Sequence, residues 1–190
     1  VFLCPSARRD DNPHTDTWPD VTPPVTFVTG GNDYGPSNGV HRGPGGLLTY
    51  APPQGPGTKD GIMTNNDISL TYADLTDGIT HTALMWEIAG RPWLWINGKQ
   101  TGAMTTGGGW ADLANGETSF EGSSVARTSH FGPCAINCTN DRRSGAYSFH
   151  PGGVHVLLCD GSVHFLNENV DVGVFVNLVT YKGGVTEPSM

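Results

Sequence analysis

Basic residues are scarce in this chain of 190 residues. Ten lysines and arginines stand against 18 aspartates and glutamates, and the formal net charge is -8. A surface that binds nucleic acid needs a basic stripe to neutralise phosphates, so this balance argues against DNA or RNA as a partner. No apolar run approaches the ~20 residues of a membrane-spanning helix. We therefore expect neither nucleic acid nor a lipid bilayer to be bound by these residues themselves.

The short motifs of the common enzyme classes are also missing. The chain contains no G-x-S-x-G, H-E-x-x-H, phosphate-binding P-loop or G-x-G-x-x-G sequence. Nothing in it assembles a nucleophile, a general base and an oxyanion site. We expect a protein that is not an enzyme and has no catalytic residue.

Glycine and proline, in contrast, are abundant. The 27 glycines and 14 prolines make up a little over a fifth of the chain, and both residues are poor in helix interiors. A hydrophobic share of 36% with five tryptophans is still enough to close a core. The composition predicts a single domain over residues 1–190, of the β or α+β class, with long Gly/Pro-rich loops.

The clearest local pattern is a hairpin near the C-terminus. Apolar residues alternate with others over 154–166, around Asp160-Gly161, a dipeptide typical of a two-residue type I′ turn. That turn would pair Val156 with Phe165 on an apolar face. The opposite, mixed face would then carry His155, Leu157, Cys159, Ser162, His164 and Leu166.

Other elements are predicted from shorter patterns. A short C-terminal helix is expected within 171–181, because apolar residues recur there at helical spacing before two glycines. Strands are expected at 25–28, 47–50, 68–72 and 92–96, a strand or short helix at 82–89, and irregular loops at 5–24 and 101–146.

Several motifs follow one another in a fixed order along the chain. They are Phe2-Leu-Cys-Pro-Ser6, Asn32-Asp-Tyr34, a Thr76–Thr82 segment leading to Glu87, Ile136-Asn-Cys-Thr-Asn140, and His150 followed by nine residues and Asp160-Gly161. In this order the sequence resembles the planctomycete prepilin-like proteins with the H-X9-DG C-terminal motif, a family whose domain has no known function. The resemblance covers nearly the whole chain.

The resemblance implies a pilin-like α+β head, in which an antiparallel sheet packs on an N-terminal helix. That helix is absent from this chain, so residues 1–190 are expected to be the C-terminal part of a longer prepilin-like protein. It further implies an exported, extracytoplasmic structural protein that assembles with other pilin-like subunits or copies of itself, and touches the membrane only through the absent helix. Motif residues with structural roles would be His150, Gly152, Gly153, Asp160, Gly161, Asp77 and Gly78.

His150 has two possible roles within its Phe-His-Pro-Gly-Gly segment. We favour a structural one, in which the ring donates to a turn carbonyl, over a catalytic one.

The four cysteines are scattered, and their even number fits two disulfides made outside the cytoplasm. Taken alone, the residues leave three connectivities open, with four reduced cysteines as a further alternative. Cys4 and Cys138 each lie in a motif shared with the family, so the resemblance implies a Cys4–Cys138 bridge. Cys134 and Cys159 are then expected to form the second bridge.

A second function class rests on three tryptophans. Trp93, Trp95 and Trp110 could form a platform on which a sugar stacks, which would make the chain an extracellular glycan-binding module. The alternative, which we favour, is a satellite core under the long loop.

We expect no metal site and no cofactor. A weaker alternative is a metal-dependent enzyme with ligands among His150, His155 and His164. Asp77 and Glu87 offer the hard oxygens that calcium prefers, but the spacing of an EF-hand is missing. Calcium is therefore a minor alternative.

Overall fold

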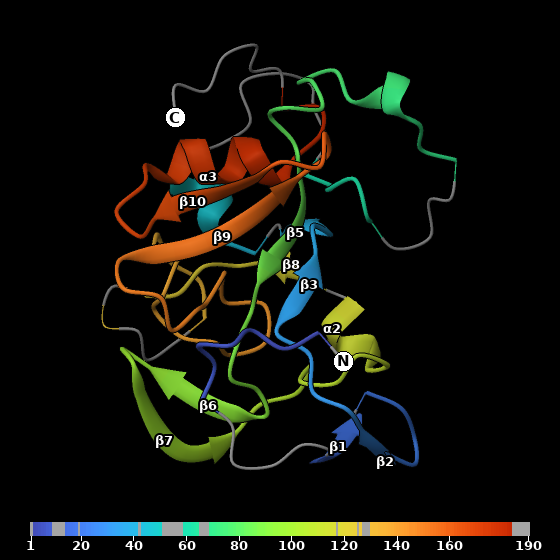
Figure 1. The fold of residues 1–190 in the computed structure, drawn as a ribbon, viewed down its shortest axis with the longest axis vertical. Coiled ribbons are helices and arrows are strands. Elements are labelled where there is room, and N and C mark those ends of the chain that lie inside the picture. Colours follow the sequence, from blue (N-terminus) through green and yellow to red (C-terminus); the bar gives the residue numbers. More distant parts are fainter. Residues whose placement is uncertain are drawn as a thin grey trace.

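The computed structural model describes residues 2–8, 14–18, 20–41, 43–50, 59–64, 69–116, 118–124, 126 and 130–183. Over these residues the chain has an α+β fold with short helices and mainly antiparallel strands (Figure 1). The expected fold class is therefore confirmed at this level. In this part of the chain no helix is long and apolar enough to span a bilayer.

A four-stranded antiparallel sheet forms the centre of the molecule, with strand order β10-β9-β5-β3. Its strands are β3 (Tyr34–Pro36), β5 (Ala83–Glu87), β9 (Gly153–Leu158) and β10 (Val163–Asn167). Helix α3 (Val172–Val179) lies over the β9–β10 end of the sheet, at the top of Figure 1. We call the face toward α3 the inner face and the opposite one the outer face.

Shorter elements surround this sheet. Two hairpin-like pairs are β1 (His14–Trp18) with β2 (Val25–Thr29), and β6 (Trp93–Ile96) with β7 (Lys99–Met104). A parallel pair joins β4 (Gly39–Val40) to β8 (Ser119–Phe120). The short helices are α1 (Leu47–Tyr50), α2 (Leu113–Gly116) and the 3₁₀ turn η1 (Tyr72–Asp74).

The main core lies between the inner face and α3. The Trp86 ring of β5 lies 4.8 Å from the Phe175 ring of α3 and 5.6 Å from Phe120, measured between centroids. Helix α3 begins after Asp171, whose carboxylate accepts a hydrogen bond of 2.8 Å from the Gly173 amide. This N-cap satisfies an amide that the helix itself leaves unpaired. The predicted C-terminal helix is thus confirmed.

The hairpin β9–β10 is present, but its predicted register is wrong. His164 pairs with Val156, and Phe165 pairs with His155. The loop has three residues instead of two, because the Leu158 amide donates to the Ser162 carbonyl at 2.9 Å. Gly161 takes the positive φ of +86° that closes such a loop.

This one-residue shift exchanges the faces of β10. Val163 and Phe165 lie on the outer face, where they are 61% and 49% exposed. His155 and His164 lie on opposite faces, so they are not the neighbouring ligand pair that the predicted register would have made.

Other local predictions have mixed outcomes. Strands are confirmed within 25–28, 82–89 and 92–96, whereas residues 47–50 form a helix. Residues 72–74 form a 3₁₀ turn, while position 68 of that predicted strand lies outside the described residues. Strands β1 and β7 occupy regions expected to be loops, because pairing with a neighbour stabilises them despite weak patterns of their own.

The predicted disulfide pairing is wrong. Cys134 is bonded to Cys138, with 6.2 Å between their Cα atoms. Cys4 and Cys159 are both buried free thiols. The motif-based pairing failed because the side chain of Cys4 faces Glu87 and His150 instead of Cys138. An antiparallel bridge between Ser123 and Cys134 holds the Cys134–Cys138 loop in place.

Candidate functional site

Four of the motifs noted in the sequence meet on the outer face of the central sheet. Glu87 ends β5 and pairs with Tyr34 of β3. Residues 2–4 run beside β3, where the Asp33 amide donates to the Phe2 carbonyl at 2.9 Å. His150 lies in the loop that leads into β9, and its ring reaches Glu87.

Glu87 is the centre of this cluster. Only 2% of the residue is exposed, and its Oε2 accepts a hydrogen bond of 2.6 Å from the backbone amide of His155. Its Oε1 lies 3.2 Å from Nε2 of His150, and its Oε2 lies 3.5 Å from Nδ1 of His155. The ion-pair partners that the described residues offer this carboxylate are thus histidines.

The thiol of Cys4 completes the cluster. Its Sγ lies 3.5 Å from Nε2 of His150, 3.6 Å from Oε1 of Glu87 and 3.0 Å from the hydroxyl of Ser6. The Cys4 amide donates to a carboxylate oxygen of Asp33 at 2.9 Å. This bond fixes the backbone that carries the sulfur.

One nitrogen of His150 therefore faces both the thiol and the carboxylate. A cysteine–histidine–acid relay needs the two partners on different ring nitrogens, so that one takes the thiol proton while the other is held by the acid. The observed contacts at Nε2 do not have this arrangement. The cluster is suited to holding a shared central group instead of relaying a proton.

Tyr34 borders the cluster and responds to it. Burial raises the pKa of its hydroxyl to about 12, and the nearby Cys4 and Glu87 act in the same direction. Tyr34 is therefore a neutral hydrogen-bonding group at all ordinary pH values.

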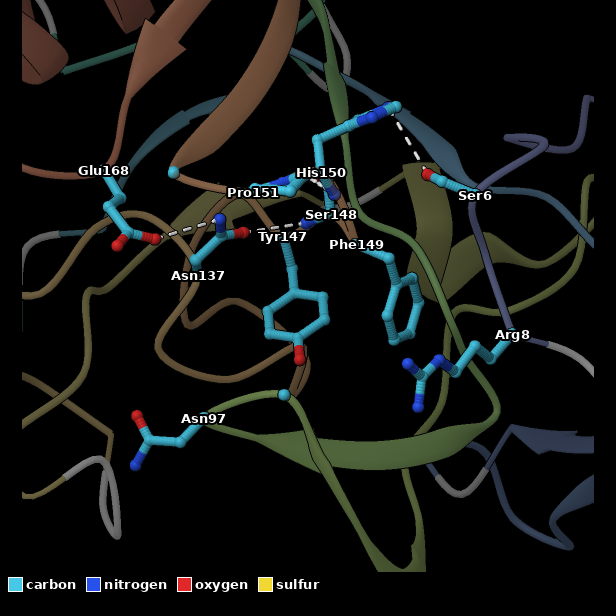
Figure 2. A pocket seen from close by; sticks show the side chains of 12 residues that line it. Ser6, Arg8, Asn97, Asn137, Tyr147, Ser148, Phe149, His150, Pro151 and Glu168 are labelled. Carbon is cyan, nitrogen blue, oxygen red and sulfur yellow. Dashed lines mark hydrogen bonds between the residues drawn. The ribbon is translucent and has the colours of Figure 1, made fainter.

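Two hollows flank His150. An apolar groove of about 340 Å³ lies over the outer face, and its wall includes Met85, Leu157 and Val163. A polar hollow of about 430 Å³ lies on the other side and includes Asn97 and Glu168. Figure 2 shows the His150 ring directed toward Ser6, whereas the Tyr147 ring points toward the turn that carries Asn97. The Phe149 ring packs against Trp95 of β6.

The remaining motif residues lie in turns and close contacts. The Asp160 carboxylate accepts from the Ser162 amide at 2.9 Å within the hairpin loop. Gly152 and Gly78 have positive φ values of +83° and +91°. Gly153 approaches β10 so closely that a Cβ atom would lie 2.1 Å from the Leu166 carbonyl oxygen.

The carboxylates of Asp77 and Glu87, which the sequence offered as calcium ligands, lie in different parts of the structure. The Asp77 carboxylate accepts a hydrogen bond of 2.6 Å from the Gly183 amide, which fastens the segment after α3. The Glu87 carboxylate belongs to the histidine cluster at the far end of β5. These two carboxylates therefore do not form one calcium site.

The three tryptophans differ strongly in exposure. Trp95 is 6% exposed, and its ring packs edge-on against Phe149 with 4.8 Å between centroids. Trp93 is partly buried, and Trp110 is 62% exposed. Trp95 has no free face on which a sugar could stack, so the structure does not present these rings as one open platform.

Sequence reasoning found His150 but missed its partners. Cys4 was interpreted as a disulfide cysteine and Glu87 as a calcium ligand. In the structure Sγ of Cys4 and Oε1 of Glu87 lie 3.5 Å and 3.2 Å from Nε2 of His150, and these two atoms are 3.6 Å apart. The sequence feature that could have linked these residues to His150 is that each of them lies in a motif of the same family. The ring of His150 contacts these side chains instead of a turn carbonyl.

Comparison with curated proteins and with solved structures gives no match. A family model described as "Protein of unknown function (DUF1559)" matches residues 1–173. This match covers most of the chain, including all the residues of the cluster. The chain therefore belongs to the DUF1559 family, the same family that its motifs resemble.

Proposed function

We propose that this chain is the head of a pilin-like protein, a non-enzymatic, exported structural subunit that acts by assembly. Its partners would be other pilin-like subunits or further copies of itself. The order of the motifs along the chain, which resembles that of prepilin-like proteins, supports this proposal. The observation that carries it is the apolar outer face of the central sheet.

The two faces of this sheet are covered differently. Phe175 and other apolar residues of α3 cover the inner face. On the outer face, Val163 and Phe165 are exposed beside the apolar groove that contains Met85 and Leu157. Contiguous exposed apolar surface is typical of interaction sites.

A helix is the occupant that fits this face best. In the pilin-like arrangement an antiparallel sheet packs on the apolar helix of a subunit, and α3 already occupies the inner face. The outer groove lies over β3, β5, β9 and β10 and has Val163 in its wall, so a helix lying on it would contact this exposed side chain. Phe165 lies on the same face of β10, two residues further along.

Crosslinking in cells tests this proposal. A photo-reactive phenylalanine analogue at position 165 of the natural, full-length protein should yield adducts that contain a pilin-like subunit or a second copy of the chain. The matched control is the same analogue at Val28, which is 71% exposed on β2. Equal adducts at the two positions, or none at position 165, would contradict the proposal.

Export is tested separately from assembly. Protease added to intact cells should degrade the full-length protein while a cytoplasmic marker survives. If the protein also survives protease after the outer membrane has been permeabilised, and is degraded only on full lysis, the extracytoplasmic location is wrong.

A further inference from the structure

Three different ligand atoms meet beside the apolar groove. The distances among Sγ of Cys4, Nε2 of His150 and Oε1 of Glu87 are 3.5 Å, 3.6 Å and 3.2 Å. Among the described residues these three form a group able to hold a metal ion. The atoms come from three separate segments: the start of the chain, the end of β5 and the loop before β9.

The triangle has the dimensions of a zinc site. Bond lengths of about 2.3 Å to sulfur and about 2.0–2.1 Å to nitrogen and oxygen, at tetrahedral angles, place sulfur about 3.5–3.6 Å from the other two atoms. The same geometry places nitrogen and oxygen about 3.3–3.4 Å apart. All three observed distances lie within about 0.2 Å of these values, the tolerance expected of a real site.

Charge balance favours a divalent cation at the same point. Cys4 and Glu87 are 3% and 2% exposed, and a buried carboxylate or thiolate is costly unless it is paired. The histidines beside Glu87 neutralise its charge only when they are protonated, and a histidine that binds a metal through Nε2 carries no proton there. A thiolate and a carboxylate together carry two negative charges, which one divalent cation neutralises. The softness of sulfur and imidazole favours zinc over magnesium or calcium.

We propose that Cys4, Glu87 and His150 bind one Zn²⁺ ion. The ion would fasten the segment around Cys4 to the central sheet. Its fourth coordination position would be filled by a water molecule from the apolar groove. Three protein ligands with one open position is a common zinc arrangement.

Surrounding groups hold the ligands in place. The His155 amide fixes Oε2 of Glu87, which leaves Oε1 directed at the other two ligands. The Ser6 hydroxyl, 3.0 Å from the sulfur, can donate to a thiolate. Outer contacts of this kind orient metal ligands and tune metal affinity.

This proposal does not depend on assembly, because it concerns ligands on the isolated chain. The experiment uses the purified chain, kept under a reductant that spares the Cys134–Cys138 bridge. After incubation with zinc and exhaustive dialysis, elemental analysis should find one zinc per chain. With cobalt in place of zinc, the near-ultraviolet thiolate-to-cobalt band and intense visible bands of tetrahedral cobalt should appear.

The cobalt spectrum of the unmodified chain decides the question even if a ligand variant fails to fold. Cobalt bound without a thiolate band, or less than a tenth of an equivalent of zinc retained, would overturn the proposal. Zinc should also raise the thermal unfolding midpoint, since it binds the folded chain.

Variants locate the site. Cys4→Ser and Glu87→Gln should abolish stoichiometric zinc retention, and Ser6→Ala should weaken it roughly 10-fold, as expected of an outer contact. The matched control is Cys159→Ser, which removes the other free buried thiol and should retain one zinc. Zinc retained by Cys4→Ser, or lost equally in Cys159→Ser, would contradict the assignment.

Discussion

The inner and outer faces of the central sheet use the same strands for different purposes. Along β9, Val154, Val156 and Leu158 enter the core, while His155 and Leu157 between them face outward. The inner face meets α3 and the long loops through tightly packed aromatic rings. The outer face holds buried polar ligand atoms and exposed apolar side chains.

This difference separates stability from binding. Residues of the inner face have their partners within the chain, so changing them should mainly alter the free energy of unfolding. Outer-face residues such as Val163 and Phe165 have apolar surface left over for a partner. The following substitutions test that separation.

The largest expected effect is on the inner face. Trp86 is fully buried against Phe120 and Phe175, so Trp86→Ala should lower the free energy of unfolding by about 3–5 kcal/mol. Met85→Ala, the adjacent residue on the outer face, is partly exposed and should cost about 1 kcal/mol. Urea unfolding curves measure both, and equal losses would contradict the division between faces.

The Cys134–Cys138 bridge should have the next largest effect, since it stabilises a loop whose Ala135 and Ile136 belong to the inner core. Its small ring restricts the unfolded chain only modestly, so replacing both cysteines by serine should cost about 2 kcal/mol. Non-reducing peptide mapping should find Cys134 joined to Cys138. A Cys4–Cys138 or Cys134–Cys159 peptide would contradict this bridge.

A smaller, pH-dependent effect is expected at His130, which joins two of the long loops. Hydrogen bonds to Asp141 and Glu121 raise its pKa from 6.5 to about 10. A raised pKa stabilises the fold fully below pH 6.5, and the contribution is lost as the pH rises to about 10. Because the side chain is 39% exposed, the effect should stay below about 1 kcal/mol.

Unfolding measured between pH 6 and 10 checks this prediction. The stability difference between the natural chain and His130→Gln should shrink as the pH rises. His81→Gln serves as the control, because the His81 ring hydrogen-bonds to the hydroxyl of the adjacent Thr80. A difference that stays constant or grows with pH would show that the ion pairs do not contribute.

The smallest effect on stability is expected from the outer face. Val163→Lys and Phe165→Lys change exposed side chains and should each alter the free energy of unfolding by about 0.5 kcal/mol or less. Thermal denaturation of each variant measures this. A loss comparable to that of Trp86→Ala would mean that the outer face belongs to the core.

The sequence predicted the elements with strong periodicity and missed what depends on long-range contacts. Alternation along 154–158 and helical spacing along 172–179 identified β9 and α3. The register of β10 was predicted wrongly, because Asp160-Gly161 is typical of a two-residue turn but also fits a three-residue loop that has glycine at its positive-φ position.

The candidate site was predicted only in part for the same reason. His150 was singled out by its motif, but its contacts with Cys4 and Glu87 span 146 and 63 residues of sequence. No local pattern specifies such contacts. They depend on the pairing of β3 with β5 and on the backbone bond from Asp33 to Phe2.

The most direct test of the central claim compares assembly with stability in the same variants. We predict that the full-length protein carrying Val163→Lys and Phe165→Lys folds normally but is absent from the assembled fraction recovered from sheared cells. The Val28→Lys control, on the exposed strand β2, should assemble like the natural protein. Normal assembly of the double variant, or equal loss in the control, would contradict a binding role for the outer face.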